Sequence, residues 1–150
     1  MDKSDKIIVG ISIGDLNGIG VEVILKTFQD NRMLDFCTPL IFANTKAISY
    51  HKKVLNLEIP IHGITSLSQI QHTKINVLNI WKEDVSITLG KASKESGDYA
   101  AKSLGIAVDY LKNKKIDVLL TAPINKETIQ SEDFNFPGHT EYLEEKLEGE

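Results

Sequence analysis

The sequence predicts a layered α/β protein with a largely parallel sheet. Short runs rich in β-branched residues alternate along the chain with segments whose apolar residues recur at helical spacing. Strands that are separated by helices usually pair in parallel, because each helix carries the chain back across the sheet. In addition, a polar stretch at 121–142 directly follows an apolar run, as ligand-binding loops follow the strands of open α/β sheets.

The first strand and helix have the clearest patterns. Residues 6–13, KIIVGISI, predict a buried strand because β-branched residues dominate them. Val21, Ile24, Leu25 and Phe28 then stand at i, i+3, i+4 and i+7, which predicts a helix with one apolar face.

The middle of the chain repeats this alternation. Residues 39–43, PLIFA, predict a second strand, and residues 46–55 predict a helix. The inward-facing candidates on that helix are Ala47, Ile48 and Val54. Residues 75–81 predict a third strand, with Trp81 as a core residue near its end.

The longest helical pattern runs from Ser93 to Lys112, and a strand at 116–120 follows it. Its apolar stripe consists of Ala100, Leu104, Ala107, Val108 and Leu111. A final helix is predicted from about Thr140, and either Gly149 ends it or the sequence stops in mid-helix at Glu150. We therefore expect residues 1–150 to be part of a longer protein.

Composition and charge argue against several classes of protein. The 150 residues are 41% hydrophobic and 25% charged, which matches a soluble domain with one core. A net charge of −4 with dispersed lysines argues against nucleic-acid binding. No apolar run approaches the roughly 20 residues that span a bilayer. The lone Cys37 cannot form an internal disulfide, and the amino terminus does not resemble a signal peptide, so a cytoplasmic protein is expected.

A glycine-rich loop, GDLNGIGVE, joins the first strand to the first helix. It does not match a dinucleotide-binding fingerprint, because Val23 replaces the third glycine and Asn44 replaces the acid expected after the second strand. A P-loop fails as well, since Ala92 follows Gly90 and Lys91. Spacing leaves a tight structural turn and a ligand loop as equal alternatives.

Other polar residues have simple structural interpretations. Asp15 is expected to anchor the glycine turn through its carboxylate, and a place in the substrate-site loop is its second interpretation. His51, His62 and His72 lack metal-ligand spacing and stand in polar surroundings, which favours surface positions.

Three segments together resemble the 4-hydroxythreonine-4-phosphate dehydrogenase family of pyridoxal phosphate biosynthesis. They are GDLNGIGVEVILKTF near the start, TLGKASKESGDYAAKSLGIAVDYL from Thr88, and VLLTAPINKETIQ with FPGHTEYLEE near the end. The combination of TAPINK and GHTE is highly specific, and the resemblance extends over essentially the whole chain. The family often has proline where Leu16 and Val21 stand here, and a small residue in place of Asn17.

The resemblance implies a three-layer α/β/α fold like that of isocitrate and isopropylmalate dehydrogenases. Residues 1–150 would be the amino-terminal portion of a two-domain protein, and the helix from about 140 would lead toward the second domain. Such enzymes are homodimers that oxidise the C3 hydroxyl of the phosphorylated substrate, pass hydride to NAD or NADP, and form a β-keto acid that loses CO₂. A divalent metal, Zn, Mg or Co, is bound by histidines and polarises the reacting oxygen.

The same resemblance assigns substrate contact to His139 and Thr140 of the GHTE motif. Thr140 is also a candidate cap for the last helix. Asn125 and Lys126 are either a helix start and a solvated side chain or parts of the substrate-site loop. No catalytic residue, metal ligand or cofactor-binding residue is assigned within the chain, and residues 1–150 alone are expected to be inactive.

Two other functions stay open at this point. A related dehydrogenase of phosphorylated sugar acids, such as phosphothreonate or phosphoerythronate, would use the same framework. A ligand-binding or dimerising module could instead have kept the loops and lost the chemistry. Histidines downstream in the reading frame would favour an enzyme over such a module.

Overall fold

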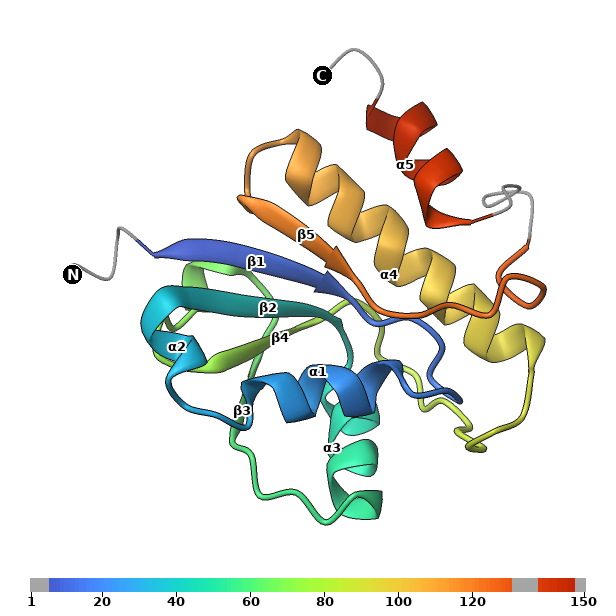
Figure 1. The fold of residues 1–150 in the computed structure, drawn as a ribbon, viewed down its shortest axis with the longest axis horizontal. Helices are drawn as coiled ribbons and strands as arrows, with labels where there is room; N and C mark the ends of the chain where they lie inside the picture. Colours follow the sequence, from blue (N-terminus) through green and yellow to red (C-terminus); the bar gives the residue numbers. More distant parts are fainter. Residues whose placement is uncertain (1–5, 131–137, 148–150) are drawn as a thin grey trace.

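A computed structural model describes residues 6–130 and 138–147 of the chain (Figure 1). The strands in these residues are β1 (Ile7–Ser12), β2 (Cys37–Ala43), β3 (Ile61–Ile64), β4 (Ile75–Asn79) and β5 (Val118–Thr121). The helices are α1 (Gly20–Phe28), α2 (Met33–Phe36), α3 (Thr45–Val54), α4 (Lys94–Lys112), α5 (His139–Leu147) and the 3₁₀ turn η2 (Leu67–Gln69). The five strands pair in parallel in the order β3-β4-β2-β1-β5.

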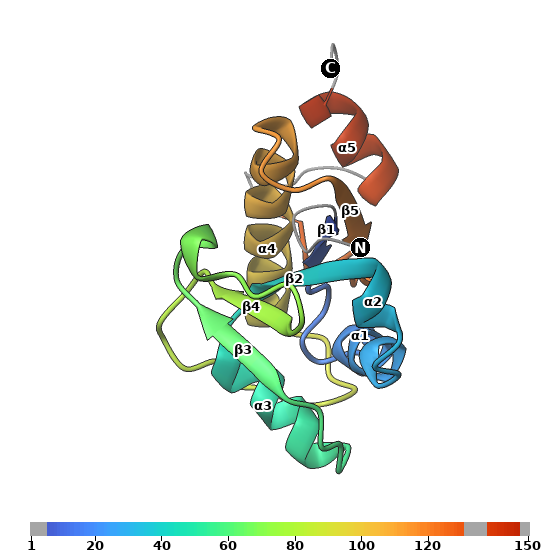
Figure 2. The same cartoon turned by 90° about the vertical axis from the view of Figure 1, so that its left-hand side faces the viewer.

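Helices cover both faces of this sheet. Leu25 of α1 and Ile48 of α3 pack with Ile41 on one face, whereas Ala107 of α4 packs with Phe42 on the other face. Figure 2 shows α4 on the opposite side of the sheet from α1. The predicted α/β fold with a parallel sheet is therefore confirmed.

The direction of the connections changes next to β1. The chain moves from β1 through α1 to β2 on one side, and α4 later brings it back to β5 on the other side. Ser12 and Thr121 are the last paired residues of β1 and β5. Open parallel sheets bind their ligands outside the carboxyl ends of strands at such a switch point.

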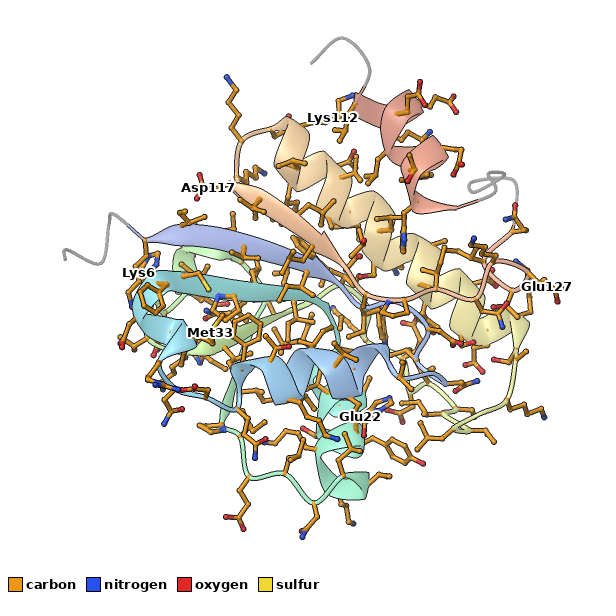
Figure 3. The ribbon with its side chains drawn as sticks, viewed as in Figure 1. Lys6, Glu22, Met33, Lys112, Asp117 and Glu127 are labelled. Atoms are coloured by element: carbon orange, nitrogen blue, oxygen red, sulfur yellow. The ribbon has the colours of Figure 1, made fainter. Side chains whose placement is uncertain are left out.

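The two ends of the sheet have different side chains. At the amino ends, the Lys6 ammonium donates to the carbonyl of Leu34 at 2.6 Å, and Asp117 accepts from the backbone N–H of Ile8 at 2.8 Å. Figure 3 places Lys6 and Asp117 at this end and Glu127 at the other, beyond the carboxyl end of β5. The motif residues after β5 therefore lie at the edge of the sheet where open parallel sheets usually bind their ligands.

The helical periodicities are confirmed, with one exception. The apolar residues of α1 and α4 pack in the core, and Trp81 is 3% exposed. Val54 is 49% exposed, so its predicted inward orientation is wrong. It is the last residue of α3, and the inward face is formed by Ala47, Ile48 and His51 instead.

The structure adds elements that the sequence did not predict. These are the edge strand β3, the short helix α2 and the turn η2. α5 begins at His139, and its last described residue is Leu147, so the predicted course of this helix at 148–150 lies outside the described residues. Within the described parts of the chain, no helix has both the length and the apolar character needed to cross a membrane.

Candidate substrate site

Two loops meet at the carboxyl ends of β1 and β5. The backbone N–H of Asp15 donates to the carbonyl of Pro123 at 2.9 Å, which joins the glycine loop to the segment after β5. Gly14 has a φ of +70°, and a Cβ there would overlap the Pro123 carbonyl. Glycine at this position is therefore required by both the backbone conformation and the close approach of the two loops.

The glycine loop is a tight turn whose donors are used internally. The Asp15 carboxylate accepts from the backbone N–H of Asn17 at 3.0 Å, and its carbonyl accepts from the N–H of Gly18 at 3.0 Å. Asp15 thus anchors the turn, while a contact between Asp15 and substrate stays a prediction. The N–H groups of Asp15, Asn17 and Gly18 are committed to these bonds, so this part of the loop does not fit a nucleotide phosphate.

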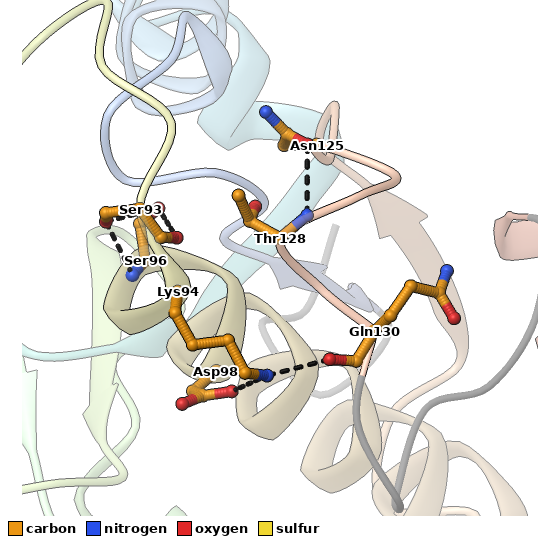
Figure 4. A network of polar contacts seen from close by, with 7 residues as sticks. All are labelled: Ser93, Lys94, Ser96, Asp98, Asn125, Thr128 and Gln130. Atoms are coloured by element: carbon orange, nitrogen blue, oxygen red, sulfur yellow. Dashed lines mark hydrogen bonds and ion pairs between the residues drawn. The ribbon is translucent and has the colours of Figure 1, made fainter.

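Asn125 begins a single helical turn after β5. Its side-chain oxygen accepts from the N–H of Thr128 at 3.1 Å (Figure 4). The same oxygen accepts from the N–H of Glu127 at 3.0 Å, and the Asn125 carbonyl accepts from the N–H of Ile129 at 3.2 Å. Ile129 is fully buried, so it fixes the turn to the core. The helix-start interpretation of Asn125 is observed, and Lys126 is exposed at the first corner of the turn.

His139 lies in the first turn of α5, near Lys126. Its Nε2 atom is buried and has no hydrogen-bond partner among the described residues. Burial lowers the pKa of His139, and the positive charge of Lys126 lowers it further. The imidazole is therefore neutral at pH 7. The side chain of Lys126 also passes Gly138, because a Cβ added to that glycine would stand 3.7 Å from the Lys126 Cε.

Thr140 is exposed and lies in the first turn of α5. The prediction that it caps the helix is wrong by two positions, because α5 begins at His139 and its N-cap position is therefore Gly138. Hydrogen bonding of the preceding backbone starts the helix earlier, with the Tyr142 N–H donating to the Gly138 carbonyl at 3.3 Å.

This arrangement suits an anionic small molecule. Lys126 supplies a positive charge, and the amino end of α5 supplies a favourable dipole. An unpaired buried polar atom costs about 1–3 kcal/mol, so a ligand that pairs with Nε2 of His139 would recover that free energy.

The other three histidines, His51, His62 and His72, lie outside the motifs that follow β5. His51 is only 2% exposed, so the predicted surface position is wrong. It follows Ala47 and Ile48 by four and three residues on α3, and this spacing was the signal that places it on the inward face. His62 and His72 are partly buried, and Nδ1 of His72 lies 2.8 Å from the Thr38 hydroxyl. The described residues contain no group of three or more His, Cys, Asp or Glu side chains placed to hold a metal ion.

An open groove of about 820 Å³ lies between α4 and α5. Lys102 and Asp109 lie on its α4 side, and Tyr142 and Lys146 lie on its α5 side. No residue of TAPINK or GHTE lines it, so the groove is separate from the polar edge at β1 and β5.

The fold defines a parallel α/β protein whose glycine loop and TAPINK segment meet beyond the carboxyl ends of β1 and β5. Comparison with known proteins identifies the family. The family model described as "Pyridoxal phosphate biosynthetic protein PdxA" matches residues 35–150, and the chain belongs to this family.

Individual relatives are similar over nearly the whole chain. The 4-hydroxythreonine-4-phosphate dehydrogenase of Bacteroides thetaiotaomicron is 43% identical over 145 residues, which are 97% of this chain and 40% of that protein. The D-threonate 4-phosphate dehydrogenase of Cupriavidus necator is 30% identical over 91% of this chain and 41% of its own length. The chain thus spans about two fifths of the curated relatives it matches.

A solved structure agrees with the fold. The crystal structure of a 4-hydroxythreonine-4-phosphate dehydrogenase from Burkholderia phymatum superposes with a TM-score of 0.85 at 28% identity. The superposition covers 94% of this chain and 43% of that one. The parallel sheet and its helices are therefore shared with that dehydrogenase from Burkholderia phymatum.

Proposed function

We propose that residues 1–150 are the amino-terminal portion of an NAD(P)-dependent dehydrogenase of 4-hydroxythreonine 4-phosphate. The enzyme would oxidise the C3 hydroxyl and transfer hydride to NAD or NADP. The resulting 2-amino-3-oxo acid would lose CO₂ and leave 3-amino-2-oxopropyl phosphate, a step of pyridoxal phosphate biosynthesis. The 43% identity to a relative of that name over 97% of the chain supports this proposal.

Within the chain, Lys126, His139 and Thr140 would hold the phosphorylated substrate. The Lys126 ammonium would attract the anion, and the neutral His139 would offer its unpaired Nε2 to a polar group of the ligand. The exposed Thr140 hydroxyl stands beside them at the amino end of α5. This role depends on one observation, the buried Nε2 of His139 that has no hydrogen-bond partner within 6–130 and 138–147.

The cofactor and metal would be held elsewhere in the full-length protein. The family resemblance supports this placement, because the metal-binding histidines and most nicotinamide-binding residues of such enzymes would follow residues 1–150. When bound, the divalent metal would act as a Lewis acid on the reacting oxygen and NAD(P) would accept the hydride. We also propose a cytoplasmic homodimer for the full-length form.

Replacing His139 tests the substrate contact. In the full-length gene product, His139→Ala should lower kcat/KM about ten- to hundredfold, the usual effect of losing a hydrogen bond to a charged group. The matched control is His72→Ala, which removes a partly buried histidine near the amino end of β2 and should leave kcat/KM unchanged. Unchanged kinetics for a folded His139→Ala variant would refute the assignment.

The second candidate substrate is D-threonate 4-phosphate, because several relatives carry that name. The two substrates differ at C2, which carries an amino group in one and a hydroxyl in the other. Comparing kcat/KM for both with the same enzyme preparation decides between them. A preference for D-threonate 4-phosphate would replace the first proposal but keep the reaction type, whereas turnover of neither substrate would favour a non-catalytic module.

A further inference from the structure

Asn17 connects the glycine loop to a distant segment of the chain. It is 3% exposed, and its side-chain oxygen accepts from the N–H of Thr88 at 2.9 Å. Its side-chain amide donates to the carbonyl of Lys91 at 2.9 Å and to the hydroxyl of Ser93 at 3.1 Å. Its own carbonyl accepts from the N–H of Gly90 at 2.7 Å. One buried residue therefore fixes the segment 88–93 against the glycine loop.

Ser93 extends this connection to the start of α4. Its side chain is the N-cap of the helix and accepts from the N–H of Ser96 at 3.1 Å. The amide of Asn17 thus reaches the same hydroxyl that begins α4. If the Ser93 hydroxyl were no longer held in place, the first turn of α4 would lose its N-cap and become less stable.

The first turn of α4 in turn holds the segment after β5. The Lys94 ammonium donates to the carbonyl of Gln130 at 2.7 Å and pairs with Asp98 at 2.6 Å (Figure 4). The backbones of Gly97 and Thr128 approach so closely that a Cβ on Gly97 would overlap the Thr128 carbonyl. The position of the turn at 125–129 therefore depends on the start of α4.

We propose that Asn17 is a positioning residue for the substrate site. It does not contact substrate, but through Ser93 and the first turn of α4 it holds the turn that presents Lys126. The identity of the ligand rests on the proposed function, whereas the mechanical connection from Asn17 to the turn does not.

A double-mutant cycle tests the connection through substrate affinity. In the full-length gene product, Asn17→Ala should raise KM for 4-hydroxythreonine 4-phosphate about tenfold and change kcat less than about twofold. Lys126→Ala should raise KM as well, and the double variant should be no worse than Lys126→Ala alone, because the positioning acts through that side chain. Effects on KM that multiply, or an Asn17→Ala variant with unchanged KM, would overturn the proposal.

Asn76→Ala is the matched control. Asn76 is also fully buried, and its amide donates to the carbonyls of Pro39, Gln71 and Lys74 at the amino end of β4. Asn76→Ala should lower Tm by about as much as Asn17→Ala does, but it should leave KM unchanged. If Asn17→Ala does not fold, Asn17→Asp keeps the acceptor for the N–H of Thr88 but loses the donors to Lys91 and Ser93, and its KM should still exceed the wild-type value.

Amide hydrogen exchange separates this inference from the proposed function. Asn17→Ala should speed exchange at the amides of Glu127, Thr128 and Ile129, and Asn76→Ala should not. If the wild-type protein turns over neither phosphorylated substrate, the proposed function fails while this measurement still tests Asn17. Unchanged exchange at these three amides would refute the positioning role.

Discussion

His51 lies on the inward face of α3 and contacts the glycine loop. The residue is buried, and its Nε2–H donates to the carbonyl of Leu16 at 2.9 Å, which fixes the tautomer. Burial lowers the pKa of His51, and it outweighs the opposite effects of the Leu16 carbonyl and the Glu22 carboxylate. A neutral His51 therefore holds Leu16 in position, and protonation of His51 in the folded protein is unfavourable.

The stability of the protein should depend on pH through His51. The folded state resists protonation, whereas the unfolded chain takes up a proton near the usual pKa of 6.5. Because the unfolded state binds more protons, the free energy of unfolding should fall as the pH drops through that value. His51→Gln keeps an N–H donor without this titration, so its stability should fall less between pH 8 and pH 5. Urea unfolding at both pH values measures the difference, and equal losses in the two proteins would contradict the assignment.

At the scale of elements, α4 connects the sheet, the segment 88–93 and the turn after β5. Its stripe of Ala100, Leu104 and Val108 packs with the buried Ile129 of that turn. The approach at Gly97 is closer still, since no side chain fits between the two backbones. The helix therefore places the candidate site as well as covering the sheet.

Gly97→Ala should damage this contact. The added methyl would overlap the Thr128 carbonyl, so we expect a loss of about 1–3 kcal/mol in the free energy of unfolding. Gly105→Ala is the control on the same helix, because its Cβ would meet only the Tyr142 hydroxyl at 3.5 Å. That variant should be neutral or more stable by about 0.5–1 kcal/mol. Thermal unfolding of both variants decides, and a Gly97→Ala protein as stable as Gly105→Ala would contradict the packing described here.

Elements with strong periodicity were predictable from the sequence, and those defined by partners were not. The apolar patterns of α1 and α4 fixed both their type and their buried faces. β3 escaped prediction because its four residues, Ile61–Ile64, include a polar histidine and a glycine and lie at the sheet edge. The TAPINK and GHTE motifs indicated the candidate site, but the proposed role of Asn17 depends on partners 71 to 76 residues away, which no local pattern shows.

The whole molecule exposes an apolar strip along β5. Val118 and Leu120 are 43% and 49% exposed, and they stand beside Val9 and Ile11 on the face that α1 covers elsewhere. Among the described residues, β5 pairs with β1 alone. Such an edge strand with apolar side chains favours association with another polypeptide.

Residues 1–150 should therefore self-associate through β5 when they are produced alone. Light scattering should show a mass that rises with protein concentration, and Val118→Lys with Leu120→Lys should shift it to that of a monomer. Val54→Lys is the control, because Val54 is equally exposed at 49% but lies on α3. A monomeric wild-type chain at high concentration, or equal effects of both sets of lysines, would contradict this role of β5.

In the proposed enzyme, residues 1–150 supply substrate contacts, and the cofactor and metal sites lie elsewhere in the full-length protein. Hydride transfer needs all three held together, and such positioning contributes about 7–11 kcal/mol to catalysis. The direct measurement is reduction of NAD or NADP, followed by absorbance, with 4-hydroxythreonine 4-phosphate and a divalent metal. Residues 1–150 should show no turnover above a control without enzyme, and the full-length gene product that contains them should be active. Turnover by residues 1–150 alone would contradict the account.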